Sequence, residues 1–497
     1  MRWLVLVLSL GAIALSVLAL ERDRTGLIIA PLAGTGTTPA TLYLTPDGGP
    51  APVVIVAHGF AGSRQLMQPI ALTLARAGYT VVSYDLQGHG RNPVPMSGDV
   101  TSIDGTTRLL VNEARAVARA ALAHPRADGR LAYLGHSMAS DIVVRAGLEE
   151  PQAQAVVGIS MFSQAVTPTE PVNLLVITGE WEGRLALEAL NALHLADPQA
   201  ASGQTTGDPA TGTGRRAVLA PAVEHVGVLY SATTLRETVA WLNAAFARDR
   251  TGPLALQGGA ILLLLVAVIA LAWPLARLLP AGKQMSAPLP RKLFWGLVVG
   301  PALVVPLVLA PVKLQFLPVL VADYLALHMG LYGVVILAVL AWTGLLRGAF
   351  ALRAVLIGLA VAVFGIVVFG TALDRYVASF TPNPERALII GALALGAVPY
   401  LLADAILTRG GAATVWQVLA VRGAFILSLM LAVALDFERL LFLLIILPVI
   451  LLFFALFGTM AGWVGRRTGL PAASGLGLGL ILAWALGVAF PLFSTGA

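Results

Sequence analysis

The stretch RLAYLGHSMAS, residues 130–140, is the point from which the fold can be worked out. An apolar run over 131–134 ends abruptly in Gly135-His136-Ser137-Met138-Ala139, and the helix-compatible segment DIVVRAGLEE follows at once. This layout predicts a strand, a tight turn that carries Ser137, and a helix. A serine on such a turn has a strained backbone and an exposed hydroxyl, with a helix N-terminus behind it. An ordinary loop serine after a buried strand fits the pentapeptide equally well, so the rest of the chain has to decide.

Strand and helix signals alternate through residues 21–250, which predicts a mostly parallel sheet covered by helices. Besides 131–134, strands are expected at residues 53–57, 79–84, 155–160, 172–177 and 217–220, and helices at about 64–77, 107–123 and 234–245. About eleven residues separate the strand 155–160 from the next one, so no helical lid fits there. Residues 198–214, rich in Gly, Thr, Ala and Pro, suggest a mobile surface loop.

A serine hydroxyl becomes a good nucleophile only when a base lies within hydrogen-bond reach and an acid orients that base. His225 follows the last expected strand and precedes the closing helix, where a base would face the C-terminal edge of the sheet. Glu182, three residues after Gly179, is the first choice for the acid, and Glu180 is the second. The alternative is that His225 is a solvated loop histidine and that both glutamates are surface carboxylates.

An attack by Ser137 would also need backbone donors aimed at the developing oxyanion. One is expected from the N–H of Met138 at the start of the helix. The other is expected from Phe60, in the glycine-punctuated loop after the strand 53–57. The pair His58-Gly59 lets that loop approach closely, and His58 is expected to shape the loop and not to transfer protons.

Taken together, these segments resemble an α/β-hydrolase over roughly residues 50–247. The resemblance rests on VVIVAHGF, YTVVSYDLQGHGRN, LAYLGHSMAS, VNLLVITGEWE and VEHVGVLYS, in the order of the family. It implies Ser137 as nucleophile, His225 as base, Glu182 as acid, Phe60 and Met138 as oxyanion donors, and a shaping role for Asp85 and His89 in the loop after their strand. The chain departs from the family pattern at Ala139, where glycine is usual, and in having Glu as the acid, where Asp is commoner.

The rest of the chain has a different composition. Only 12% of the 497 residues are charged, whereas soluble proteins carry about 25%. Residues 3–20 fit a signal peptide or a signal anchor, and their length and the lack of an Ala-x-Ala cleavage site favour an uncleaved anchor. Residues 254–497 contain eight apolar segments, each long enough to cross a hydrocarbon core of ~30 Å. The expected domains are therefore a transmembrane anchor at 1–20, an α/β-hydrolase domain at 21–250 and an all-α multi-pass membrane domain at 254–497.

Loop charges predict how these nine segments cross the membrane. Alternate loops carry an excess of arginine and lysine, and the positive-inside rule places them in the cytoplasm. These residues are Arg277, Lys283, Arg291, Lys292, Arg347, Arg353, Arg409, Arg466 and Arg467. The N-terminus is then inside, the C-terminus outside, and the hydrolase domain on the extracytoplasmic or periplasmic side of what we expect to be a cell inner membrane. Asp323, His328, Asp404 and Arg422 lie near segment ends, which favours an interfacial position.

Composition also limits the function. The absence of cysteine excludes disulfides, thiol catalysis and cysteine-ligated metals. The sequence has no basic stripe interleaved with aromatic residues, so we do not expect it to bind nucleic acid. We expect no cofactor and no metal. The leading prediction is a membrane-bound serine hydrolase that cleaves a carboxylic ester or thioester of a hydrophobic or envelope-derived substrate through an acyl-enzyme.

Three alternatives stay open: a peptidase, an acyltransferase, and a transporter or scaffold whose hydrolase-like domain only binds. The expected partners are a small-molecule or lipid-like substrate and the lipid bilayer, and the oligomeric state is left open. The missing lid and the tether at each end of the domain suggest an active face held near the bilayer.

Overall fold

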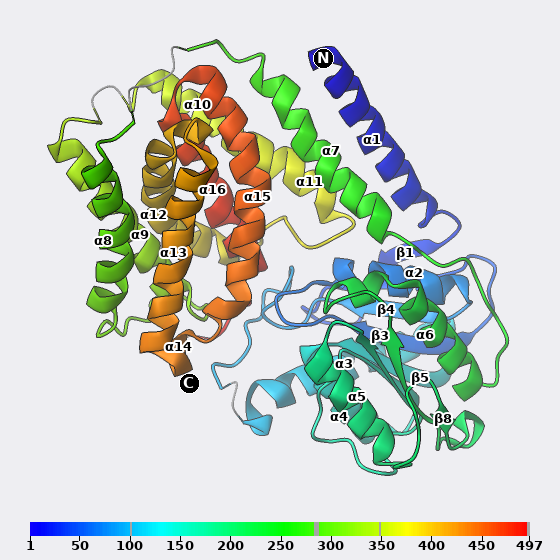
Figure 1. The fold of residues 1–497 in the computed structure, drawn as a ribbon. Coiled ribbons are helices and arrows are strands. Elements are labelled where there is room, and N and C mark those ends of the chain that lie inside the picture. Colours follow the sequence, from blue (N-terminus) through cyan, green and yellow to red (C-terminus); the bar gives the residue numbers. More distant parts are fainter. Residues whose placement is uncertain (100–101, 283–287, 347–348, 495–497) are drawn as a thin grey trace. The chain divides into compact units, whose positions relative to one another are not determined.

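The computed structural model describes residues 1–99, 102–282, 288–346 and 349–494, and the chain folds as two compact units (Figure 1). We call the first the sheet unit, which comprises Leu15–Leu262, Asp374–Ser379 and the residues from Pro491 onward. The second, the helical unit, comprises Met1–Ala14, Leu263–Leu373 and Phe380–Phe490. Each unit is described separately below.

The sheet unit is built on one nine-stranded sheet with the strand order β1-β2-β4-β3-β5-β6-β7-β9-β8. Pairing is parallel from β4 through β3, β5, β6 and β7 to β9, and antiparallel where β1, β2 and β8 join the edges. The strands are β1 (Ile28–Pro31), β2 (Ala40–Leu44), β3 (Ala51–Ala57), β4 (Thr80–Tyr84), β5 (Ala127–His136), β6 (Ala153–Ile159), β7 (Leu174–Gly179), β8 (Thr205–Thr206) and β9 (Arg215–Ala220). The α/β fold class with a mostly parallel sheet is confirmed, while β1, β2 and β8 are additional to the predicted strands.

Helices cover both faces of this sheet, as its unbroken apolar strands require. They are α2 (Gln68–Arg76), α3 (Arg108–Leu122), α4 (Met138–Glu149), α5 (Gly183–His194) and α6 (Ala232–Ala245), with short helical turns η1 (Arg64–Met67), η2 (Ile103–Thr107), η3 (Pro209–Thr211) and η4 (Gly227–Tyr230). Residues of α2 and α6 share one buried cluster with Val54 and Val56 of β3. All seven residues of β3 are buried, so the opposite face is covered as well.

Two connections of the sheet unit bear on the site. The described residues 160–173, between β6 and β7, contain no helix, in agreement with the expectation that no lid is inserted there. Residues 198–214, expected to be a mobile loop, contain β8 and η3, and β8 pairs with β9.

Two segments from distant parts of the sequence also belong to the sheet unit. Phe493 forms a parallel bridge with Met96, and the Leu492 N–H donates to the Gly88 carbonyl at 2.8 Å. In the segment Asp374–Ser379, the Ser379 N–H donates to Ser63 Oγ at 3.0 Å. The unit therefore extends beyond the range 21–250 that the sequence suggests, because these segments supply backbone partners to its loops.

The described residues include nine helices that are long and apolar enough to cross a membrane, which fits an integral membrane protein. They are α1 (Arg2–Arg22), α7 (Gly258–Ala276), α8 (Arg291–Leu309), α9 (Ala322–Trp342), the run Leu352–Asp374 made of α10 (Leu352–Val363), η5 (Phe364–Phe369) and α11 (Gly370–Asp374), α12 (Pro384–Leu407), α13 (Val415–Leu435), α15 (Leu443–Thr468) and α16 (Pro471–Ala489). Two shorter elements are η6 (Arg409–Gly411) and α14 (Phe437–Leu440).

Glycines bring the helices of this unit close together. A Cβ on Gly396 of α12 would lie 2.2 Å from the Ala326 carbonyl oxygen of α9, and one on Gly475 of α16 would lie 2.5 Å from the Leu401 carbonyl oxygen of α12. Only glycine allows such backbone contact, which is how membrane helices commonly associate.

Charged side chains inside the helical unit pair with one another. Both carboxylate oxygens of Asp404 accept hydrogen bonds from Arg422, each at 3.2 Å, and Asp404 is almost fully buried. His328, also buried, lies 3.0 Å from Ser428 Oγ through its Nε2. Asp404 lies near the end of α12, whereas His328 and Arg422 lie about two turns inside α9 and α13. Their side chains can turn into the bundle because pairing removes the cost of placing them among apolar helices.

Candidate active site

The turn between β5 and α4 has the geometry that its sequence predicts. Ser137 has φ 53° and ψ −121°, a positive φ that a residue with a side chain rarely adopts. Its N–H donates to the Ile159 carbonyl of β6 at 2.9 Å, which ties the turn to the neighbouring strand. The strained backbone of Ser137 is therefore held in place by the sheet.

The small residues on either side of Ser137 allow this turn. A Cβ on Gly135 would lie 2.4 Å from the Ala139 carbonyl oxygen, so β5 and the first turn of α4 can cross only where glycine stands. Ala139 is fully buried and has α-helical backbone as the second residue of α4. Its methyl group is accommodated, and the departure from the usual glycine does not disturb the turn.

His225, in the loop between β9 and η4, reaches Ser137. Its Nε2 lies 2.8 Å from Ser137 Oγ, and its Nδ1 lies 2.5 Å from Glu182 Oε1. With Nδ1–H donating to the carboxylate, Nε2 is left to accept the serine proton. Three side chains from three loops at the C-terminal edge of the sheet thus form one hydrogen-bonded chain.

Glu182 is anchored independently of His225. Its Oε2 accepts hydrogen bonds from the Gly179 N–H and from Ser160 Oγ, both at 2.7 Å. Burial alone would raise the pKa of the Glu182 carboxyl, but the bonds from His225, Ser160 and Gly179 outweigh it and hold that pKa below its usual value. The carboxylate is therefore ionised and correctly oriented for His225.

Glu180, the second choice for the acid, occupies a different position. Its carboxylate accepts the Ala222 N–H at 2.8 Å, and the residue is exposed. The structure brings Glu182, and not Glu180, to His225.

His136 and Ser160 contribute to the site, and neither was singled out from the sequence. The His136 Nε2–H donates to the His225 backbone carbonyl at 2.8 Å, and the two rings lie 4.8 Å apart. Burial, assisted by His225, lowers the pKa of His136 to about 4, so its ring is neutral near pH 7. The position directly before the serine in the elbow was the available signal for His136, whereas nothing in the sequence marks Ser160 as a partner of the acid.

The two residues expected to supply oxyanion donors belong to segments that adjoin Ser137. Met138 is the first residue of α4, so its N–H has no partner within the helix. Phe60 follows Gly59 in the loop after β3, and a Cβ on Gly59 would lie 3.0 Å from the Ser137 Cβ. Because residue 59 is glycine, this loop can pass directly against the serine turn.

His58 and Asp85 shape the surrounding loops. His58 is fully buried, with Nδ1 donating to the Gly59 carbonyl at 2.8 Å and Nε2 accepting the Leu86 N–H at 3.2 Å. Burial lowers the pKa of His58, and both ring nitrogens are already used, so the ring fixes the loop. Asp85 accepts hydrogen bonds from the backbone N–H and the guanidinium of Arg64, each at 2.8 Å.

No group of three or more His, Asp or Glu side chains suited to hold a metal ion occurs within the described ranges. Around Ser137 the structure places the His225 imidazole and the Glu182 carboxylate in one hydrogen-bonded chain with the serine hydroxyl.

Comparison with known families identifies the fold of the sheet unit. Residues 48–211 match the family model described as serine aminopeptidase, S33, an α/β-hydrolase family. The sheet unit is an α/β-hydrolase domain. The matched range contains the serine turn and Glu182 and ends before His225. The family match therefore belongs to the sheet unit and does not extend to the membrane-type helices that follow it.

Individual relatives are distant. An uncharacterised protein of Mycobacterium tuberculosis is 30% identical over 111 residues, which are 22% of this chain and 36% of that protein. The match thus spans little more than a third of the length of this relative. Among solved structures, a dienelactone hydrolase from Anabaena variabilis is 19% identical, with a TM-score of 0.31, over 44% of this chain and 96% of that chain. An esterase from the archaeon Pyrobaculum calidifontis is 15% identical, with a TM-score of 0.31, over 49% of this chain and 93% of that chain.

Proposed function

We propose that this protein is a membrane-bound serine hydrolase that cleaves an ester or thioester of a hydrophobic substrate through an acyl-enzyme on Ser137. The observation that carries the proposal is the hydrogen-bonded chain from Ser137 through His225 to Glu182. A surface serine without a function requires neither a positive φ nor an ordered imidazole–carboxylate pair.

The proposed reaction has two halves. Ser137 Oγ attacks the substrate carbonyl while His225 Nε2 takes its proton, and Glu182 stabilises the imidazolium that forms. The N–H groups of Met138 and Phe60 would stabilise the oxyanion of the tetrahedral intermediate. The carbon–oxygen or carbon–sulfur bond then breaks, and His225 returns the proton to the leaving group. Water, activated by the same histidine, releases the acid from Ser137.

Exposed apolar side chains next to the catalytic residues support a hydrophobic substrate. Trp181 is adjacent in sequence to Glu182 and 67% exposed, and Val226 is adjacent to His225 and 45% exposed. Phe162, whose N–H contacts Ser140 at the start of α4, is 51% exposed. Apolar surface beside a reactive serine is typical of a site that binds an acyl chain.

We further propose that the hydrolase domain is extracytoplasmic, in a cell inner membrane. Arg2 is the first residue of α1 and Arg277 directly follows α7, so the chain enters and leaves the domain through helices whose far ends are basic. The positive-inside rule places those ends in the cytoplasm. The chain has no cysteine, so a single cysteine at exposed Gln199 should react with an impermeant maleimide on intact spheroplasts, whereas one at Thr343 should react only after lysis. The reverse pattern would overturn this orientation.

The matched family description favours one other substrate class, since it names an aminopeptidase. The same triad would cleave an amide if the site captured the free amine of a peptide.

Purified full-length protein in detergent distinguishes the two classes. We expect p-nitrophenyl octanoate to be hydrolysed with a higher kcat/KM than the acetate, and leucine p-nitroanilide to be cleaved poorly. Ser137→Ala should lower the esterase rate by about 10⁴-fold or more. Turnover of the anilide but not of either ester would replace the esterase with the peptidase, and an esterase rate that survives in Ser137→Ala would overturn the serine mechanism.

A further inference from the structure

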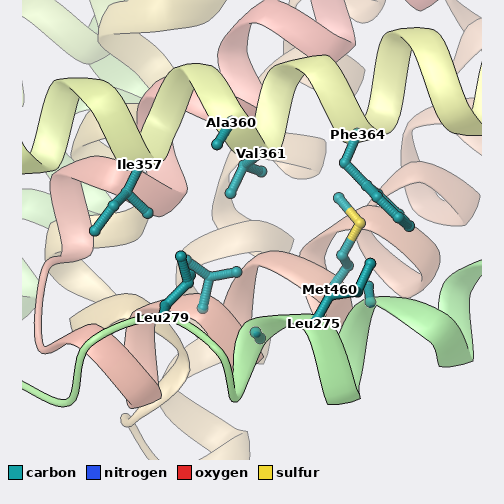
Figure 2. Close-up of a pocket in the computed structure, with 10 residues that line it drawn as sticks. Leu275, Leu279, Ile357, Ala360, Val361, Phe364 and Met460 are labelled. Carbon is teal, nitrogen blue, oxygen red and sulfur yellow. The ribbon is translucent and has the colours of Figure 1, made fainter. Parts of the chain in front are cut away.

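Beyond the hydrolase site, the helical unit contains an apolar groove between α7, the α10–η5 run and α15 (Figure 2). Its walls include Leu275, Ile357, Val361, Phe364, Met460 and Val464. Figure 2 shows the side chains from α7 and from α10 pointing toward one another across the groove. From Ile357 to Phe364 the wall rises about 10 Å, roughly one third of a hydrocarbon core of ~30 Å.

A basic pocket adjoins one end of this groove. It is lined by Arg277 at the end of α7, by Arg466 and Arg467 at the end of α15, and by Trp273 and Trp463. Ala276 lines both the pocket and the groove, so the apolar walls lead directly to the three guanidinium groups. Tryptophan next to arginine at the end of a membrane helix is typical of the headgroup level of a bilayer.

The arginines are oriented by the protein and keep donors to spare. The Arg467 Nε–H donates to the Leu279 carbonyl at 2.9 Å, and Arg466 donates to the Gly411 carbonyl at 2.7 Å. The Arg277 guanidinium lies 5.2 Å from the centre of the Trp273 ring. Within the described part of the chain, no carboxylate pairs with any of the three. Each guanidinium has five N–H donors, so most of them point to no protein acceptor.

We propose that this pocket and groove bind one anionic phospholipid, with its phosphate on Arg277, Arg466 and Arg467 and the first part of one acyl chain between α7 and α10. Charge complementarity identifies the headgroup. Three arginines without a carboxylate partner match the net negative charge of an anionic phospholipid, whereas a zwitterionic headgroup balances its phosphate with its own cation. The groove identifies the lipid source, because a free phosphate or nucleotide would leave the apolar walls empty.

The test uses full-length protein purified in detergent, stripped of lipid and titrated with dioleoylphosphatidylglycerol or dioleoylphosphatidylcholine under native mass spectrometry. We expect one phosphatidylglycerol to bind about tenfold more tightly than phosphatidylcholine. In Arg277→Gln/Arg466→Gln this preference should disappear. Arg467 is kept, because its bond to Leu279 joins α15 to the end of α7.

Two further variants separate the pocket from general charge effects. Arg291→Gln/Lys292→Gln removes the same number of positive charges at the exposed start of α8, and it should keep the tenfold preference. Ala360→Phe places a ring in the groove without altering charge, and it should weaken phosphatidylglycerol binding several-fold.

Three results would overturn the proposal: equal binding of the two lipids by the wild type, an equal loss in the Arg291/Lys292 variant, or displacement of the lipid by millimolar inorganic phosphate. A normal gel-filtration profile for each variant shows that it is folded, so each outcome reports on the site.

Discussion

The two units of this chain use buried polar groups in different ways. In the hydrolase domain, the buried groups near the C-terminal edge of the sheet lead to one partly exposed hydroxyl: Ser160 and Gly179 hold Glu182, which holds His225, which reaches Ser137. In the helical unit, Asp404 and Arg422 use their charges on each other, and His328 bonds to Ser428. A network of hydrogen-bonded side chains that reaches solvent is typical of a reactive site, whereas a charge pair buried within a helix bundle is typical of a structural role.

This difference predicts which substitutions abolish activity and which lower stability.

Glu182→Gln should give the largest change. The amide cannot accept the His225 Nδ1–H in the same way and favours the wrong tautomer, so kcat should fall by about 10⁴-fold at an unchanged fold. The measurement is the rate of p-nitrophenyl octanoate hydrolysis by purified protein.

Glu180→Gln is the matched control, because it removes a carboxylate two residues away that accepts the Ala222 N–H and does not contact His225. Its rate should stay within about threefold of the wild type. If Glu180→Gln were the more damaging change, the acid would be misassigned.

Arg422→Ala should act on stability, with little effect on the hydrolase reaction. It leaves Asp404 buried and unpaired among apolar helices, which is expected to cost about 3–5 kcal/mol. Thermal unfolding of the protein in detergent should show the helical unit melting well below the wild type.

The double variant Asp404→Leu/Arg422→Met sharpens this test. Since it removes both charges and keeps the volume, it should recover most of the lost stability. If the double variant were as unstable as Arg422→Ala, the ion pair itself would stabilise the bundle, beyond avoiding an unpaired buried charge.

His136 should give the hydrolase domain a pH-dependent stability. Its pKa is lowered from 6.5 to about 4, so the unfolded chain binds a proton between these values and the folded domain does not. The stabilisation is complete above pH 6.5 and is lost progressively as the pH falls from 6.5 to 4. The difference between the unfolded and folded pKa values of His136 corresponds to about 3 kcal/mol of unfolding free energy.

His136→Gln removes this titration and can still donate to the His225 carbonyl. Urea unfolding at pH 7 and pH 4.5 should therefore show a smaller loss in His136→Gln than in the wild type, with buried His58 contributing equally to both. Identical losses would contradict the buried, neutral state of His136.

The serine turn, the strands of the central parallel sheet and the membrane-type helices were predictable, because each follows from a local pattern. The apolar run 131–134 and Gly135 suggest an elbow at Ser137, and the later Glu182 and His225 decide for it. Long apolar segments are sufficient to predict the membrane-type helices. The antiparallel edge strands were not, since β1 and β8 have four and two residues and little apolar alternation.

Contacts across long stretches of sequence were also beyond prediction. Ser160 reaches Glu182 only because β6 and β7 are neighbours in the sheet, and Arg422 reaches Asp404 only because α12 and α13 pack together. The segments 374–379 and 491–494 join the sheet unit through backbone bonds that no side-chain pattern announces.

The central claim is that Ser137 is a nucleophile activated by His225. The most direct measurement is to treat the full-length protein with a fluorophosphonate and map the adduct by peptide mass spectrometry. We predict one adduct, on Ser137, that His225→Ala slows by several orders of magnitude and Ser137→Ala abolishes. An unlabelled wild type, or an adduct that persists in Ser137→Ala, would contradict the account.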